Sequence, residues 1–227
     1  MGKGTGSVSG DVSEATKYRG RLAEGADVLM ECLEASEEFQ KRVFRVVVYA
    51  HLLLVGKHIM ATSDDPRMHR WLNMQFLMTY HHNFVRHVIE GELQRRIYAL
   101  AEKGQPVTAS LLSKVQGEIL DEFWGGEVEI AEGARLTRMR QPLYHMGLYP
   151  YSYSASLTIG TAVTASIEQE GQPVVDRWLE VLKAGGTLPP VDLAAMAGVD
   201  MTNPEAIRTA VEYVGKLVDG VEQGFAG

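Results

Sequence analysis

The segment ATSDDPRMHRWLNMQFLMTYHHNFVRHVIEGELQRRIYALAEKG, residues 61–104, decides the fold class. Asp65 is a residue type that caps helix N-termini, and Pro66 suits the first helical position because an N–H there would lack an intrahelical partner. Gly104 tolerates the left-handed backbone that commonly follows a helix C-terminus. These signals predict one long helix that ends near Lys103. Its expected apolar side consists of Trp71, Met74, Met78, Val85, Val88, Ile89 and Leu93.

Similar signals divide the rest of the chain into helices. Helical patterns cover residues 13–41, 109–123, 151–170, 172–184 and 189–197, and a last helix begins near residue 203, capped by Thr202 or Asn203. Residues 43–60 are apolar and partly β-branched, so both strand and helix remain open there. Because no alternating strands with hairpin turns occur, the sequence predicts an all-α, multi-helix fold.

Composition limits the classes of function. The 227 residues are 45% hydrophobic and 22% charged, which is typical of one globular helical domain or part of a larger one. The net charge of −7 argues against a nucleic-acid partner. A single cysteine excludes an internal disulfide and a Cys-rich zinc site, and favours a reducing, cytoplasmic location. The longest apolar run, residues 46–60, is too short to span a membrane.

The seven histidines raise the question of a metal site. On an ideal α-helix, His82 and His87 are five residues apart and point about 140° away from each other. His51 and His58 share a face but lie roughly 10 Å apart along the axis, too far for one zinc ion. We therefore expect these side chains to be structural or exposed. The minor alternative is a metal site with nearby carboxylates, built from His81, His82, His87 or His145.

A second unusual feature is a tyrosine cluster, in which Tyr144, Tyr149, Tyr151 and Tyr153 fall within ten residues. Phenols can donate hydrogen bonds to a developing oxyanion, so the cluster is a candidate site. Aromatic packing of an irregular segment is the alternative.

The tyrosines belong to a longer pattern. MRQPLYHMG at 139–147 and LYPYSYSASL at 148–157 resemble the signature of oligoendopeptidase F-like zinc metallopeptidases. WLEVLKAGGTLPPVDLAAMAGVDMTNPEAI at 178–207 is similar to the tail of that family, and residues 61–104 are similar to the helix that follows its zinc site. The resemblance divides the chain into a disordered N-terminus (1–12), a helical segment that does not match the family (13–50) and the C-terminal part of the catalytic domain (51–227).

The resemblance implies a bowl-shaped, mostly helical domain that hydrolyses short peptides with zinc. In the family, two histidines of an HExxH helix and a glutamate on the next helix hold the zinc, and the HExxH glutamate activates water. Carried over by position, Tyr149, Tyr151 and Tyr153 would contact the substrate or stabilise the transition state, and His145 would be a displaced histidine of the same site.

This chain departs from the family pattern at the metal site. It contains no HExxH, and the stretch FRVVVYAH at 44–51, where the third ligand is expected, has no glutamate. Leu143 stands at the substrate-side histidine, and Ser156 replaces the final glycine of the signature. We therefore expect no metal site in this chain and no hydrolysis by the chain alone. Either it is a truncated or frame-shifted peptidase, or it is a non-catalytic pseudo-peptidase that binds peptides and associates with a second copy or a complementing chain.

Overall fold

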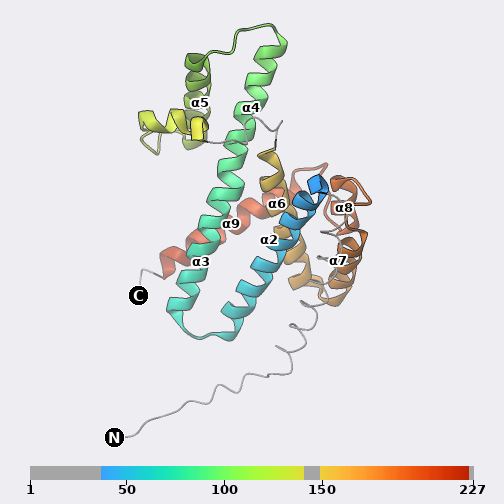
Figure 1. Cartoon of the computed structure of the whole chain (residues 1–227). Coiled ribbons are helices and arrows are strands. Elements are labelled where there is room, and N and C mark those ends of the chain that lie inside the picture. The colour runs from blue at the N-terminus through green and yellow to red at the C-terminus, as the bar shows by residue number, and fades with distance from the viewer. Residues whose placement is uncertain (1–36, 141–148, 225–227) are drawn as a thin grey trace, which may run out of the picture.

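The computed structural model describes residues 37–140 and 149–224, with the side chains of 37–44 excepted. This part of the chain contains helices and no strand, so the all-α prediction is confirmed (Figure 1). The expected disorder of residues 1–12 and the helical pattern before residue 37 lie outside the described residues. The elements are α2 (Glu37–Thr62), α3 (Pro66–Tyr80), η1 (His81–Arg86, a π-helix), α4 (His87–Glu102), α5 (Ala109–Trp124), η2 (Glu132–Arg140, a 3-10 helix), α6 (Tyr151–Glu170), α7 (Gln172–Ala184), α8 (Pro190–Met196) and α9 (Glu205–Gln223).

The predicted caps explain where several helices begin and end. Asp65 Oδ1 accepts a hydrogen bond of 2.9 Å from Arg67 N, directly beside Pro66 at the start of α3. Of the two caps proposed for the last helix, Asn203 is the one that forms, because its Oδ1 accepts from Glu205 N at 2.9 Å. The signals at these ends are local, which is why the sequence was sufficient to find them.

Helix α2 settles the ambiguous segment at residues 43–60. Val47, Ala50 and Leu53 are buried three residues apart, as one face of a helix requires. This face packs along α6 rather than against a strand. Gly160 permits the close approach, because a Cβ there would lie 3.0 Å from Ala50 N.

The long helix predicted to end near Lys103 is interrupted, because η1 forms a π-helical turn between α3 and α4. Its apolar side was also partly mispredicted, since Trp71 is 56% exposed and Met78 is 60% exposed. The buried face of α3 contains Leu72, Phe76 and Tyr80 instead. Residues 66–80 are apolar on more than one side, and packing against α9 and α2 selects which side is covered.

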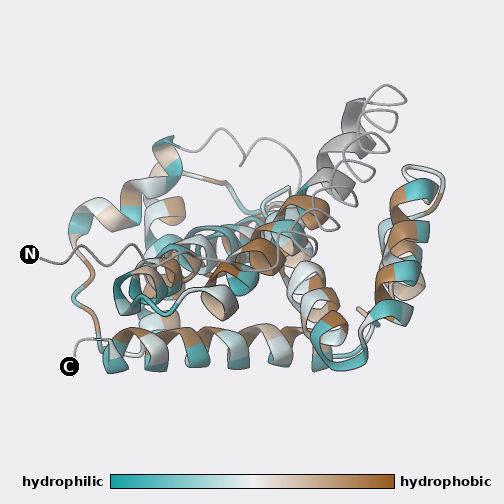
Figure 2. Cartoon of the chain, turned by 90° about the horizontal axis from the view of Figure 1, so that it is seen from below, coloured by the Kyte–Doolittle hydropathy of each residue, from teal (hydrophilic) through white to brown (hydrophobic). Residues whose placement is uncertain are grey.

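Three apolar clusters hold the helices together. One joins α2, α6, α7, α8 and the first turn of α9, a second joins α2, α3, α6 and α9, and a third joins α4 to α5. In Figure 1, α5 and η2 lie beside the far end of α4, away from α7 and α8. Hydrophobic and hydrophilic residues alternate along the helices (Figure 2), as expected when one face of each is covered. None of the described helices has the length and apolar character needed to cross a membrane.

Candidate functional site

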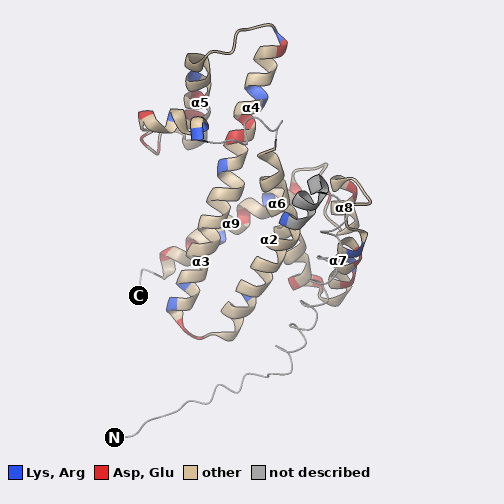
Figure 3. Ribbon diagram, viewed as in Figure 1, with Lys and Arg blue, Asp and Glu red and all other residues tan. Residues whose placement is uncertain are grey.

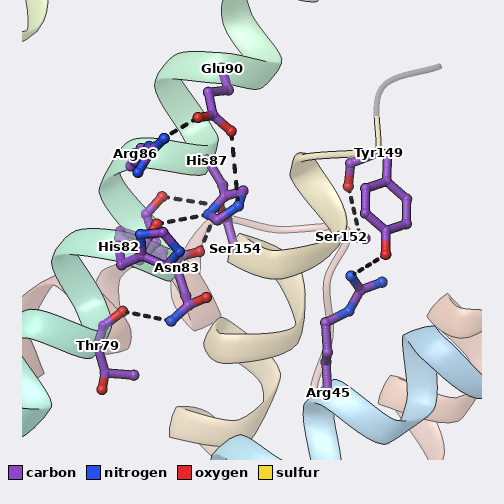
Figure 4. A network of polar contacts seen from close by, with 11 residues as sticks. Arg45, Thr79, His82, Asn83, Arg86, His87, Glu90, Tyr149, Ser152 and Ser154 are labelled. Carbon is purple, nitrogen blue, oxygen red and sulfur yellow. Dashed lines mark hydrogen bonds and ion pairs between the residues drawn. The ribbon is translucent and has the colours of Figure 1, made fainter. Parts of the chain in front are cut away.

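A polar cluster lies where the first turn of α6 meets α2, η1 and α4 (Figure 4). We call it the Arg45 cluster, and it comprises Arg45 from α2, His82, His87 and Glu90 from η1 and α4, and Tyr149 and Tyr153 at the start of α6. Buried polar groups are costly unless they are paired, so such a concentration beside an apolar core requires a physical explanation.

The π-helical turn brings two of the histidines together. His87 Nδ1 donates a hydrogen bond of 2.7 Å to the His82 carbonyl oxygen, and the two rings meet edge to face at 5.2 Å. The expected divergence of about 140° between them was wrong, because it assumed an ideal α-helix. A π-helix bonds residues five apart, so the fifth residue returns towards the same face.

The same turn is docked onto α6 through its backbone. Ser154 Oγ donates to the carbonyl oxygens of Phe84 at 3.0 Å and Asn83 at 3.3 Å. Asn83 Nδ2 in turn donates to the Thr79 carbonyl oxygen at 3.1 Å. These bonds fix the position of η1 relative to the tyrosines of α6.

Burial shifts the pKa values of His87 and Glu90 in opposite directions. Desolvation lowers the pKa of His87 to about 4, so the imidazole is neutral at pH 7. Because Nδ1 carries the proton that it donates to His82, Nε2 presents a lone pair. Glu90 Oε2 lies 3.9 Å from that nitrogen, and this contact is not an ion pair while His87 is neutral. Burial also raises the pKa of Glu90, against the opposing effect of Arg86, whose Nε donates to Glu90 Oε1 at 3.0 Å.

Arg45 is the central cation of the cluster and is only 9% exposed. Its Nη1 donates to the Tyr149 hydroxyl at 2.9 Å, and its guanidinium carbon lies 4.8 Å from the Tyr149 ring centroid and 4.2 Å from that of Tyr153. The Tyr153 ring also stacks on His87, with 4.2 Å between centroids and 18° between planes. A continuous row of aromatic faces and N–H donors therefore runs from Tyr149 to His87.

The structure separates the tyrosines that the sequence grouped. Tyr149 and Tyr153 meet edge to face at 5.5 Å in the Arg45 cluster. Tyr151 points towards α4 instead, where a Cβ on Gly91 would lie 2.8 Å from its ring. His145 lies outside the described residues.

Sequence reasoning missed Arg45 and Glu90 as members of a site, and it named His87 only as a possible metal ligand. A weak signal existed for Arg45, because it is the one charged residue in the apolar stretch VFRVVVYA at 43–50. His87, Glu90 and Gln94 are polar residues at helical spacing, and all three are buried on α4. Neither pattern indicates which elements meet there.

The residues of the cluster do not fit a zinc ion. Within the described ranges, no three His, Cys, Asp or Glu side chains converge on one point. His87 Nδ1 is already engaged with a carbonyl oxygen, and His81 lies against the Trp124 ring at 6.5 Å. The alternative metal site at His81, His82 and His87 therefore does not form from the described residues. The available chemistry is hydrogen-bond donation and aromatic stacking.

Comparisons with known proteins identify one family for the chain. The sequence model of peptidase family M3 matches residues 65–213. Oligopeptidase PepF of Bacillus subtilis (strain 168) is 28% identical over 170 residues, which is 75% of this chain and 25% of that protein. An oligoendopeptidase F homolog of Borreliella burgdorferi is 20% identical over 172 residues, 76% of this chain and 29% of that protein.

A solved structure shows the same fold. The crystal structure of oligoendopeptidase-F from Enterococcus faecium superposes with a TM-score of 0.72 at 21% identity, covering 89% of this chain and 44% of that one. The chain therefore spans between a quarter and a half of the relatives that it matches.

Proposed function

Since this chain belongs to peptidase family M3, we propose that it forms a peptide-binding wall of an oligoendopeptidase F-like catalytic domain and does not hydrolyse peptides by itself. The observation that carries the proposal is the row from Tyr149 through Arg45 and Tyr153 to His87. Its unused N–H donors are those of Arg45, and Tyr149 and Tyr153 add aromatic faces that a peptide can contact; among the described residues it lacks the ligands that a metal would need.

The absence of hydrolysis follows from the general base that zinc peptidases require. In such enzymes a carboxylate next to the metal accepts a proton from the attacking water. No HExxH occurs in the 227 residues. Glu90 is a poor substitute, because one of its oxygens is held by Arg86 and burial favours its protonated form. Another part of the domain would then have to supply both the HExxH helix and the zinc that it binds.

Within this wall we assign different roles to the predicted residues. Tyr149 and Tyr153 contact the peptide, and Arg45 holds the Tyr149 hydroxyl in place. Tyr151 packs against Gly91 and positions the start of α6 on α4. His145 keeps the role that the resemblance gives it, a second contact to the peptide.

Two assays test the proposal on the purified chain. A quenched fluorescent peptide incubated with the chain and added zinc should remain uncleaved. Dye-labelled short peptides should bind saturably. Tyr153→Leu should weaken binding, because it removes the aromatic ring that lies between Arg45 and His87. Cleavage that a chelator abolishes would contradict the proposed inactivity. Failure of every peptide to bind would contradict the proposed peptide-binding role.

A second proposal concerns the partner. Val48, Leu52 and Val55 are exposed at helical spacing along α2, and Trp71 and Met78 are exposed along α3. Extended apolar patches on a soluble protein commonly mark association surfaces. We propose that a second copy of the chain, or a complementing chain that carries the rest of the domain, covers them.

The charge distribution favours peptides over nucleic acid as ligands. Lys and Arg are interspersed with Asp and Glu along the helices in the view of Figure 3. With a net charge of −7, the chain lacks the cationic excess that a phosphate backbone requires. The single cysteine and this acidic balance suit the cytoplasm, where we place the protein.

A further inference from the structure

Arg45 has binding capacity that the described residues do not use. Its Nε and Nη2 are buried and have no hydrogen-bond partner in the described ranges, although Nη1 reaches Tyr149. An arginine is charged at every physiological pH, and a buried charge is costly unless an anion pairs with it. Two adjacent N–H groups on one guanidinium match the two oxygens of a carboxylate.

A cavity of about 160 Å³ lies between α2, α6, α7 and α8. Its wall is apolar and includes Val46, Ala155, Trp178 and Leu193. Apolar cavities of about 150 Å³ are large enough for one benzene molecule, so this one can hold a single leucine or phenylalanine side chain.

Two serines on the cavity wall do not make it polar. Ser152 Oγ donates to the Tyr149 carbonyl oxygen at 2.6 Å, and Ser156 Oγ donates to the Ser152 carbonyl oxygen at 2.6 Å. Their hydroxyl protons are thus used by backbone carbonyl oxygens in and just before α6. The indole Nε1 of Trp178, which also lines the cavity, is a buried side-chain donor without a partner among the described residues.

Residues of the Arg45 cluster and residues of the cavity wall are adjacent in sequence on α2 and at the start of α6. Arg45 and Val46 are consecutive on α2, and they face the tyrosines and the cavity respectively. On α6, Tyr153 follows Ser152, which lines the cavity and is bonded to Tyr149. Figure 4 shows Arg45, Tyr149 and Ser152 close together. A carboxylate on Arg45 would therefore lie close to the residues that line the apolar cavity.

We propose that this place binds the C-terminal residue of a short peptide, with its free carboxylate on Arg45 and its apolar side chain in the cavity. The inference rests on the proposed function, because it presupposes that the chain binds peptides. It adds the direction in which the peptide lies and the class of its last residue. A carboxylate from an Asp or Glu side chain would satisfy Arg45 but would leave the cavity empty.

The test compares peptides that differ only at their ends. The probes are N-terminally dye-labelled Ala-Ala-Leu as the free acid, the same peptide as the C-terminal amide, and Ala-Ala-Gly as the free acid. The free acid of Ala-Ala-Leu should bind roughly 10- to 100-fold more tightly than its amide, because the amide lacks a charge-assisted acceptor. It should also exceed Ala-Ala-Gly by about tenfold or more, because leucine burial is lost.

Variants separate the two halves of the site. Arg45→Met should remove the preference for the acid over the amide, whereas Arg208→Met, which removes the same charge from an exposed position on α9, should keep it. Ala155→Phe fills the cavity, so it should remove the preference for leucine over glycine and keep the preference for the acid. Circular dichroism confirms that each variant is folded.

The outcomes are distinguishable. If peptides bind equally well as acids and amides, the inference is overturned while the proposed function survives. If none of the three peptides binds, both the inference and the proposed peptide-binding function are overturned. The comparison of acid with amide uses the unaltered chain, so it decides the matter even if Arg45→Met fails to fold.

Discussion

The contact between α2 and α6 predicts that Gly160 and Gly215 respond oppositely to the same substitution. Both glycines lie inside helices, Gly160 in α6 and Gly215 in α9. A Cβ on Gly160 would lie 3.0 Å from Ala50 N and 3.2 Å from Tyr49 Cβ. A Cβ on Gly215 would have no atom within 4 Å.

The magnitudes follow from two opposing effects. Alanine is about 1 kcal/mol more favourable than glycine inside a helix, and Gly215→Ala should gain that amount. At Gly160 the same gain is opposed by overpacking of roughly 1–3 kcal/mol, since the atoms of α2 that it meets include backbone and can move only with the helix. Gly160→Ala should therefore be less stable than Gly215→Ala by about 1–3 kcal/mol.

Urea unfolding followed by circular dichroism measures both changes. Because Arg45 lies on α2 and its tyrosine partners lie at the start of α6 or just before it, a shift between these helices should also weaken peptide binding in Gly160→Ala. Equal stabilisation by the two substitutions would refute the close contact of α2 with α6 and with it the geometry of the Arg45 cluster.

Three further predictions concern the site, the core and the surface. The free energy of unfolding should fall as the pH is lowered from 6.5 towards 4, because in that window the imidazole of His87 binds a proton only in the unfolded chain. The fall should be up to roughly 3 kcal/mol larger in the unaltered chain than in His87→Gln, and urea titrations at several pH values measure it. Leu93→Ala should lower the free energy of unfolding by about 2–5 kcal/mol, whereas Arg96→Met should lower it by under about 1 kcal/mol. The reason is that a buried apolar cluster, rather than the surface ion pair between Arg96 and Glu122, holds α4 and α5 together, and thermal or urea unfolding measures both changes. The double variant Trp71→Glu, Met78→Glu should sediment as a monomer at concentrations where the unaltered chain associates, and unchanged sedimentation of the two would contradict the proposed partner surface.

Most of the fold was predictable because its signals are local. Pro66 after Asp65, Thr108 before α5 and Gly125 after it mark helix ends by backbone preferences that act within a few residues. The covered face of α3 was not predictable in the same way. Trp71 and Leu72 are both apolar, and only the positions of α2 and α9 decide which of them is buried.

The site was predictable only in part. The tyrosine pattern located Tyr149 and Tyr153, and the two meet in the structure. Arg45 lies 104 residues from Tyr149 in the sequence, and their hydrogen bond exists only because α2 and α6 pack side by side.

The sequence by itself determined the all-α class, most helix boundaries, the resemblance to the family and the lack of an HExxH motif, because each depends on residue identity and short spacing. The tertiary structure alone decided that His82 and His87 meet, since a π-helical turn docked on Ser154 changes the angular period that spacing arguments assume. It likewise decided that Arg45 is buried between two tyrosines, because the cost of a buried charge depends on what lies around it in space and not on its neighbours in the chain.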